Sequence, residues 1–143
     1  MATPKYYYHI TQRKWPDKIT LRPKKSGCHR ASNEPKIYRT CVSSTIEGCL
    51  VALGCCLYSN VTISIYRTVN KVLAVEPYDV SDSHVTKEKW LTRPIKFKKV
   101  GIINNKLTSQ VYNLSTGDLD TLPGQYKLLD YLRNRKQNYV TWL

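Results

Sequence analysis

The sequence predicts one α+β domain, with a small, mixed and mainly antiparallel split sheet, one core helix and a C-terminal helix. Segments rich in tyrosine and β-branched residues recur through the first hundred residues, which is typical of strands. A capping-box pattern at Ser44–Glu47 starts an apolar helical segment. A second helical pattern lies near the C-terminus. At 143 residues the chain has the usual size of a single domain, residues 1–143, with a core of its own.

The first third of the chain predicts two strands separated by a long loop. Lys5–Thr11 contains three consecutive tyrosines beside β-branched residues, and Pro16 ends this strand pattern. Residues 22–36 contain two prolines, a glycine and several lysines and arginines, which predicts an exposed basic loop. Loops of this length are more often functional than idle. Ile37–Val42 predicts the second strand.

The core helix is predicted directly after that strand. In the capping box the Ser44 hydroxyl is expected to accept a bond from a backbone N–H, and Glu47 is expected to reach back to another. Four apolar residues then recur at helical spacing: Ile46, Leu50, Leu53 and Leu57. Gly54 is expected to weaken or end the helix near its last turn.

Further strand patterns follow. Val61–Val69 alternates β-branched and small polar residues, and Val72–Val75 continues this strand or pairs beside it. Residues 76–86 are polar and predict a loop. Trp90–Leu91 and Ile95–Ile103 are strand-like, and alternating lysines in the second indicate one wet and one buried face.

The last helix is predicted at Gln125–Lys136, where Tyr126, Leu129 and Leu132 share one face. Its end is basic, which suits the negative end of the helix dipole. We expect residues 117–143 to form a helical appendage to the domain.

The charge distribution predicts an anionic partner, either a protein or a nucleic acid, or a nucleotide ligand. The formal net charge is +13. Residues 1–39 carry ten lysines and arginines against two acids, and residues 81–143 carry eleven against five. Residues 40–80 are nearly neutral, as expected of a core between solvent-facing flanks.

The chain is expected to be cytoplasmic and without membrane contact. Its longest apolar stretch, Ile46–Tyr58, is too short to cross a bilayer, and the amino terminus lacks a signal pattern. The five cysteines are odd in number and lack the paired spacing of a zinc site, so we expect reduced thiols and no metal.

The order of landmarks along the chain resembles the ADP-ribosyltransferase fold. A strand ends in Tyr8–Thr11, and after the basic loop a strand runs into a helix through Cys41–Glu47. Another strand follows at Ile63–Tyr66, and Glu88 precedes the late strand at Trp90. The resemblance covers residues 6–103 as an order of elements.

The resemblance implies an NAD-dependent glycosyl-type transfer to a macromolecular partner. In that family the first strand contacts the NAD ribose, a serine-bearing strand supports the nicotinamide end, and a late glutamate stabilises an oxocarbenium-like ribose. By resemblance His9 takes the first role, Ser43 the second and Glu88 the third, so His9 and Glu88 are the catalytic candidates. The cofactor-binding candidates are His9, Thr11, Arg22, Arg39, Ser43 and Tyr66.

Several of these roles have a physical rationale in the sequence itself. The two arginines suit phosphate oxygens. Lys87 and Lys89 flank Glu88 and are expected to keep it ionised. The chain departs from the family pattern at Thr86, where the family has Glu or Gln, which argues against transfer to arginine.

Two alternatives remain open. A basic, tyrosine-rich chain suits a non-catalytic nucleotide- or nucleic-acid-binding inhibitor module, of the kind found in phages and mobile elements. His9 with Thr11, and His84 with Thr86, form two His-x-Thr motifs, as in two-histidine phosphoesterases. The second copy lies in a polar segment and not on an apolar strand, so this alternative ranks third.

Overall fold

Most of the chain is described in the computed structural model. The described residues are 3–24, 37–54, 57–58, 60–78, 80, 82–114 and 121–143. Most of the predicted basic loop, residues 25–36, lies outside them, as do Cys28, Cys55 and Cys56.

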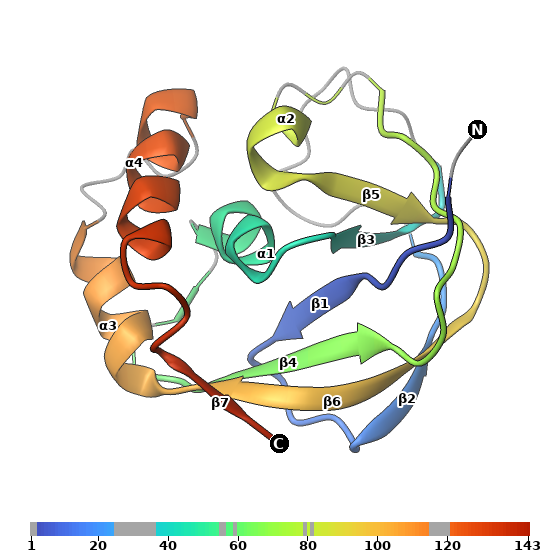
Figure 1. Ribbon diagram of the computed structural model, residues 1–143, viewed down its shortest axis with the longest axis horizontal. Helices are drawn as coiled ribbons and strands as arrows, with labels where there is room; N and C mark the ends of the chain where they lie inside the picture. The colour runs from blue at the N-terminus through green and yellow to red at the C-terminus, as the bar shows by residue number, and fades with distance from the viewer. Residues whose placement is uncertain are drawn as a thin grey trace.

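Within these ranges seven strands form one sheet, and every pairing between them is antiparallel (Figure 1). The strands are β1 (Tyr8–Thr11), β2 (Lys18–Leu21), β3 (Thr40–Ser43), β4 (Ile63–Thr68), β5 (Glu88–Leu91), β6 (Ile95–Ile103) and β7 (Val140–Trp142). Their order is β2-β6-β4-β1-β3-β5, and β7 also pairs with β6. The α+β class and the mainly antiparallel sheet agree with the prediction.

Four helices accompany the sheet in the same described ranges. They are α1 (Ile46–Leu53), α2 (Ser83–Thr86), α3 (Asn105–Leu114) and α4 (Leu122–Arg133). Helix α1 contacts β1 and β3 on one side and α4 on the other (Figure 1). Leu128, Leu129 and Leu132 of α4 belong to the same buried cluster as Leu50 of α1. The C-terminal helix therefore contributes to the core.

The core consists of two apolar clusters, which follow the alternation of side chains across the sheet. On β4, Ile63 and Ile65 belong to the cluster beneath the helices, whereas Tyr66 belongs to the second cluster with Phe97. We call the side of the sheet with Ile65 the helix face and the side with Tyr66 the aromatic face. Paired residues on neighbouring strands share a face, so the register assigns every strand residue to one of them.

The start of α1 differs by one residue from the predicted capping box. Thr45, and not Ser44, caps the helix, because its Oγ1 accepts from the Gly48 N–H at 3.0 Å. Glu47 does not reach back to the cap, since its carboxylate accepts a bond of 3.1 Å from Gln137. The helix ends at Gly54, as predicted.

Candidate functional site

The strands that carry His9, Ser43 and Glu88 are neighbours in the sheet. β3 lies between β1 and β5. Tyr8 of β1 pairs with Ser43, and Ser43 pairs with Glu88 of β5. Segments separated by more than thirty residues in the sequence therefore meet in one row of the sheet.

Ser43 connects the start of α1 to the turn that carries Glu88. Its side chain is buried, with its hydroxyl donating to the Thr86 carbonyl at 2.7 Å and accepting from the Thr45 N–H at 3.2 Å. Thr86 Oγ1 in turn accepts from the Glu88 N–H at 3.2 Å. The Ser43 hydroxyl is therefore engaged inside the protein, where it links the start of α1 to the turn that precedes Glu88.

Glu88 is half-buried on β5, and its carboxylate is oriented by the strand itself. The Trp90 indole N–H donates to Glu88 Oε2 at 2.7 Å, and the Trp90 side chain is fully buried. The neighbouring Lys89 was expected to keep Glu88 ionised, but its ammonium pairs with Glu76 at 2.9 Å. Alternation along β5 also directs Lys89 to the opposite face from Glu88.

His9 links β1 to β3 through its side chain. A carbonyl oxygen can only accept, so His9 Nδ1, 3.0 Å from the Cys41 carbonyl, is the protonated nitrogen. The ring stacks on Trp15 with centroids 5.6 Å apart and meets Phe97 edge-on. Burial lowers the pKa of His9 below its ordinary value, and the bond to Cys41 offsets only part of this effect. His9 is therefore neutral at pH 7, with Nε2 as its acceptor.

His9 and Glu88 lie on opposite faces of the sheet. Glu88 pairs with Ser43 and Ser43 with Tyr8, so these three side chains share the helix face. His9 follows Tyr8 and projects to the aromatic face, where it contacts Trp15. A ligand that contacts both His9 and Glu88 must therefore extend from one face to the other.

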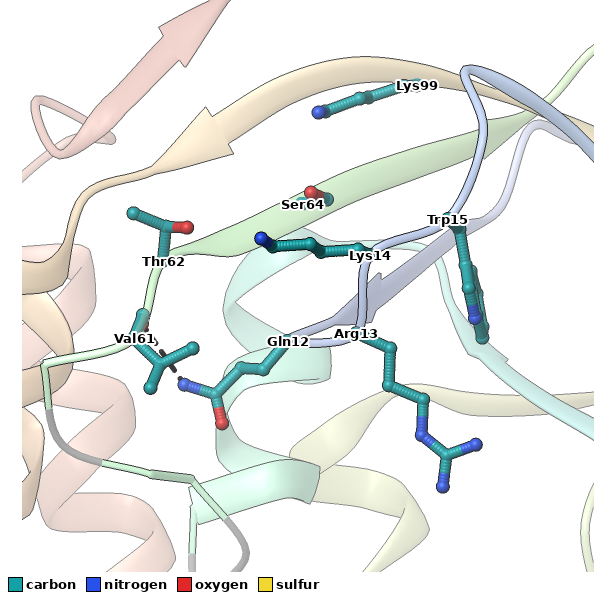
Figure 2. Close-up of a pocket in the computed structure, with 8 residues that line it drawn as sticks. All are labelled: Gln12, Arg13, Lys14, Trp15, Val61, Thr62, Ser64 and Lys99. Atoms are coloured by element: carbon teal, nitrogen blue, oxygen red, sulfur yellow. Dashed lines mark hydrogen bonds between the residues drawn. The ribbon is translucent and has the colours of Figure 1, made fainter.

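A pocket of about 290 Å³ opens beside the end of β1 (Figure 2). It is lined by Gln12, Arg13, Lys14, Trp15, Val61, Thr62, Ser64 and Lys99. Three hydrogen bonds of two buried side chains hold the loop that forms one wall. Thr11 Oγ1 accepts from the Arg13 N–H at 3.0 Å, and the Tyr66 hydroxyl donates to the Trp15 and Pro16 carbonyls at 3.0 and 2.8 Å. Thr11 and Tyr66, both predicted ligand residues, are buried and support this loop.

The two predicted phosphate-binding arginines lie elsewhere. Arg39 is buried, with its guanidinium carbon 4.1 Å from the centre of the Trp90 ring, so it is not presented to a ligand at the surface. Arg22 is exposed directly after β2. Lys14 and Lys99, which the sequence interpretation did not select, are the basic residues that line the pocket together with Arg13.

The second His-x-Thr motif does not lie on a strand. His84 belongs to the four-residue helix α2, and its ring lies 6.0 Å from that of Tyr126 on α4. Val85 beside it packs into the helix-face cluster, whereas His9 projects to the aromatic face. The two histidines are thus separated by the sheet, an arrangement that gives no support to phosphodiester cleavage between them.

The lowered pKa of His9 predicts a pH-dependent stability. The unfolded chain takes up a proton on this residue near pH 6.5, whereas folded His9 resists protonation until lower pH. The contribution of His9 to the free energy of unfolding is complete above the pKa that it has in the unfolded chain. This contribution is lost as the pH falls through the pKa of His9 in the folded chain. Between pH 7 and 5 the unfolding free energy should fall less steeply in His9→Asn than in wild type. Urea unfolding at several pH values measures this slope.

The matched control for that experiment is His84→Gln, which replaces an exposed histidine. It should retain the wild-type slope. An equal slope in wild type and His9→Asn would contradict the assignment of the pH dependence to His9.

Within the described ranges, no three His, Cys, Asp or Glu side chains are grouped to hold a metal ion. Two cysteines are described: Cys41 is exposed and Cys49 is buried, and burial raises the pKa of Cys49 to about 12. Every helix in this part of the chain is too short or too polar to span a bilayer.

Comparison with protein-family models, curated proteins and solved structures finds no match to this chain.

Proposed function

We propose that this chain is an NAD-dependent ADP-ribosyltransferase-like protein that binds NAD through His9 and modifies a macromolecular partner. The observation that carries the proposal is that β1, β3 and β5 are neighbours in the sheet. These strands carry His9, Ser43 and Glu88 respectively. The resemblance in sequence concerns only the order of the strands and helices along the chain. Adjacency of these strands in space is an independent feature that supports the same function.

The state of His9 suits a ribose hydroxyl. Its Nδ1–H is held by the Cys41 carbonyl, so the ring orientation and tautomer are fixed before any ligand binds. Neutral Nε2 then accepts a hydrogen bond from a hydroxyl donor. A sugar hydroxyl is such a donor, and a phosphate oxygen is not.

The environment of Glu88 suits a group that stabilises developing positive charge. Breaking the nicotinamide–ribose bond builds that charge at the anomeric carbon, and a fixed carboxylate lowers the barrier. The Trp90 indole fixes one carboxylate oxygen, and the Ser43–Thr86 contacts fix the backbone of the strand. The role of Ser43 in the proposal is therefore support of Glu88.

The second candidate, a basic nucleotide-binding module without catalysis, is favoured by a different observation. The pocket is bounded by Trp15, whose ring stacks on His9, so it adjoins His9 on the aromatic face. Glu88 is on the helix face. Binding and catalysis thus depend on different sides of the sheet and are tested by separate variants.

We expect His9→Asn to weaken NAD and ADP-ribose binding about tenfold while preserving the fold, the loss of one well-placed hydrogen bond. Asparagine keeps a donor near the position of Nδ1, so the bond to Cys41 can be retained, but it lacks Nε2. Titration calorimetry gives the affinity, and thermal unfolding checks the fold.

His84→Gln is the control and should bind as wild type does. NAD affinity that is unchanged in a folded His9→Asn variant would remove His9 from the binding site. Absence of NAD and ADP-ribose binding by wild type would overturn the proposed function.

A further inference from the structure

We propose that the pocket between the Gln12–Trp15 loop, β4 and Lys99 binds the pyrophosphate of a nucleotide. The proposal rests on the function given above, because it identifies where the phosphates of that ligand are held. It replaces Arg22 and Arg39 with a different set of basic residues. The ligand class is a nucleoside diphosphate or a dinucleotide.

The charge of the pocket favours an anion. Lys14, Lys99 and Arg13 contribute the charge, and Thr62, Ser64 and Gln12 contribute hydrogen-bonding side chains. In the described part of the chain, none of the three cations lies within 4.0 Å of a carboxylate oxygen. The lining includes no aspartate or glutamate. Unpaired cations beside hydroxyl groups match the acceptor-rich surface of a pyrophosphate.

The backbone directs the two lysines into the same space. β6 pairs Gly101 with Ile65 but Lys99 with Tyr66, so Val100 is an extra residue that forms a bulge. A bulge redirects the side chains beside it. The Lys99 N–H donates to the Asp17 carbonyl at 2.7 Å, which fixes this segment against the loop that carries Lys14. Figure 2 shows Lys14 and Lys99 extending in the same direction on either side of Ser64, whereas Arg13 and Trp15 extend away from them.

The size and position of the pocket favour a nucleotide over a nucleic-acid strand. About 290 Å³ is near the lower end for small-ligand pockets, enough for a pyrophosphate but not for a whole dinucleotide. The remaining part of the ligand must therefore extend out of the pocket. Trp15 lines the pocket and its ring stacks on His9. A ligand that extends out of the pocket past Trp15 therefore reaches the proposed ribose contact at His9. Single-strand binders instead use a long groove with successive stacking platforms.

The test compares Lys14→Gln, Lys99→Met and the control Lys106→Gln, in which an exposed lysine on α3 is replaced. Affinities for ADP-ribose, ADP, inorganic pyrophosphate, adenosine and a short single-stranded oligonucleotide are measured by calorimetry at low salt. Each pocket variant should bind ADP-ribose, ADP and pyrophosphate about tenfold more weakly, and Lys106→Gln should bind within about twofold of wild type. Unfolding temperatures within a few degrees of wild type confirm that each variant folds.

The outcomes separate this proposal from the function on which it rests. ADP-ribose binding that is equal in the pocket and control variants would overturn the pocket and leave NAD binding intact. Lysine-dependent pyrophosphate binding without NAD or ADP-ribose binding would support the pocket and overturn the proposed function. Oligonucleotide binding that is tighter than that of every mononucleotide, or no phosphate binding at all, would overturn the nucleotide assignment of the pocket.

Discussion

Gly48→Ala should lower the free energy of unfolding by about 3 kcal/mol or more, a large loss for an overpacked core position. A Cβ atom on Gly48 would lie 1.9 Å from the Thr86 carbonyl oxygen and 2.4 Å from Ser43 Oγ. The first contact is with backbone, so it cannot be relieved by a rotamer change. Alanine favours a helix by only about 1 kcal/mol over glycine, which does not offset the clash. For a chain of this size the melting temperature should fall by about 10 °C.

Gly101→Ala is the matched control, because Gly101 is also buried and its added Cβ would meet no atom closer than 3.2 Å. It should be destabilised less than Gly48→Ala. Equal unfolding free energies for the two variants would contradict the close approach of α1 to the Thr86 turn. Since that turn carries Glu88, Gly48→Ala should also lose any activity that depends on the orientation of Glu88.

Glu88→Gln should reduce NAD turnover about 100- to 1,000-fold, the usual loss when a group that stabilises transition-state charge is removed. Glutamine keeps an oxygen that accepts from the Trp90 indole, so the side chain remains oriented while its charge is lost. Ground-state affinity for NAD should change little, because the charge acts on the transition state. Nicotinamide release, with water or a lysate protein as acceptor, measures turnover, and calorimetry measures affinity.

Glu76→Gln is the control for that measurement. Glu76 is an exposed carboxylate that pairs with Lys89, on the strand of Glu88. Its replacement should leave turnover unchanged. Wild-type rates in Glu88→Gln would exclude the catalytic assignment, and NAD binding by wild type without turnover would favour the non-catalytic module.

The sequence predicts the elements with long periodic patterns better than the short ones. The helix pattern at Ile46–Leu53 and the strand pattern at Ile63–Thr68 are confirmed within a few residues. β2 and β7 were not predicted, because they have only four and three residues. Segments this short are too brief to be identified by an alternating pattern, and each becomes a strand by pairing with β6. α3 was also missed, although Asn104 gave a recognisable signal: its Oδ1 accepts from the Lys106 and Leu107 N–H groups.

The candidate site could be predicted only in part, because face and register depend on tertiary pairing. Alternation predicts that His9 and Thr11 share a face, but the face of Glu88 follows from its pairing with Ser43. Lys14 follows the His9 motif closely and could have been selected with Trp15 as a basic–aromatic pair. Lys99 could not, since its direction depends on the bulge at Val100 and on the pairing of β6 with β4.

The contact between His9 and Cys41 bears on how cooperatively the domain behaves. β1 joins β3 through the Tyr8–Ser43 pair, and the His9 side chain reaches the Cys41 carbonyl beyond that pair. By contrast, four residue pairs join β1 to β4 and four join β3 to β5. The junction between β1 and β3 thus has the fewest paired residues in the described part of the sheet. Because the His9 side chain adds a contact across this junction, we expect a ligand held at its Nε2 to stiffen the link between β1 and β3.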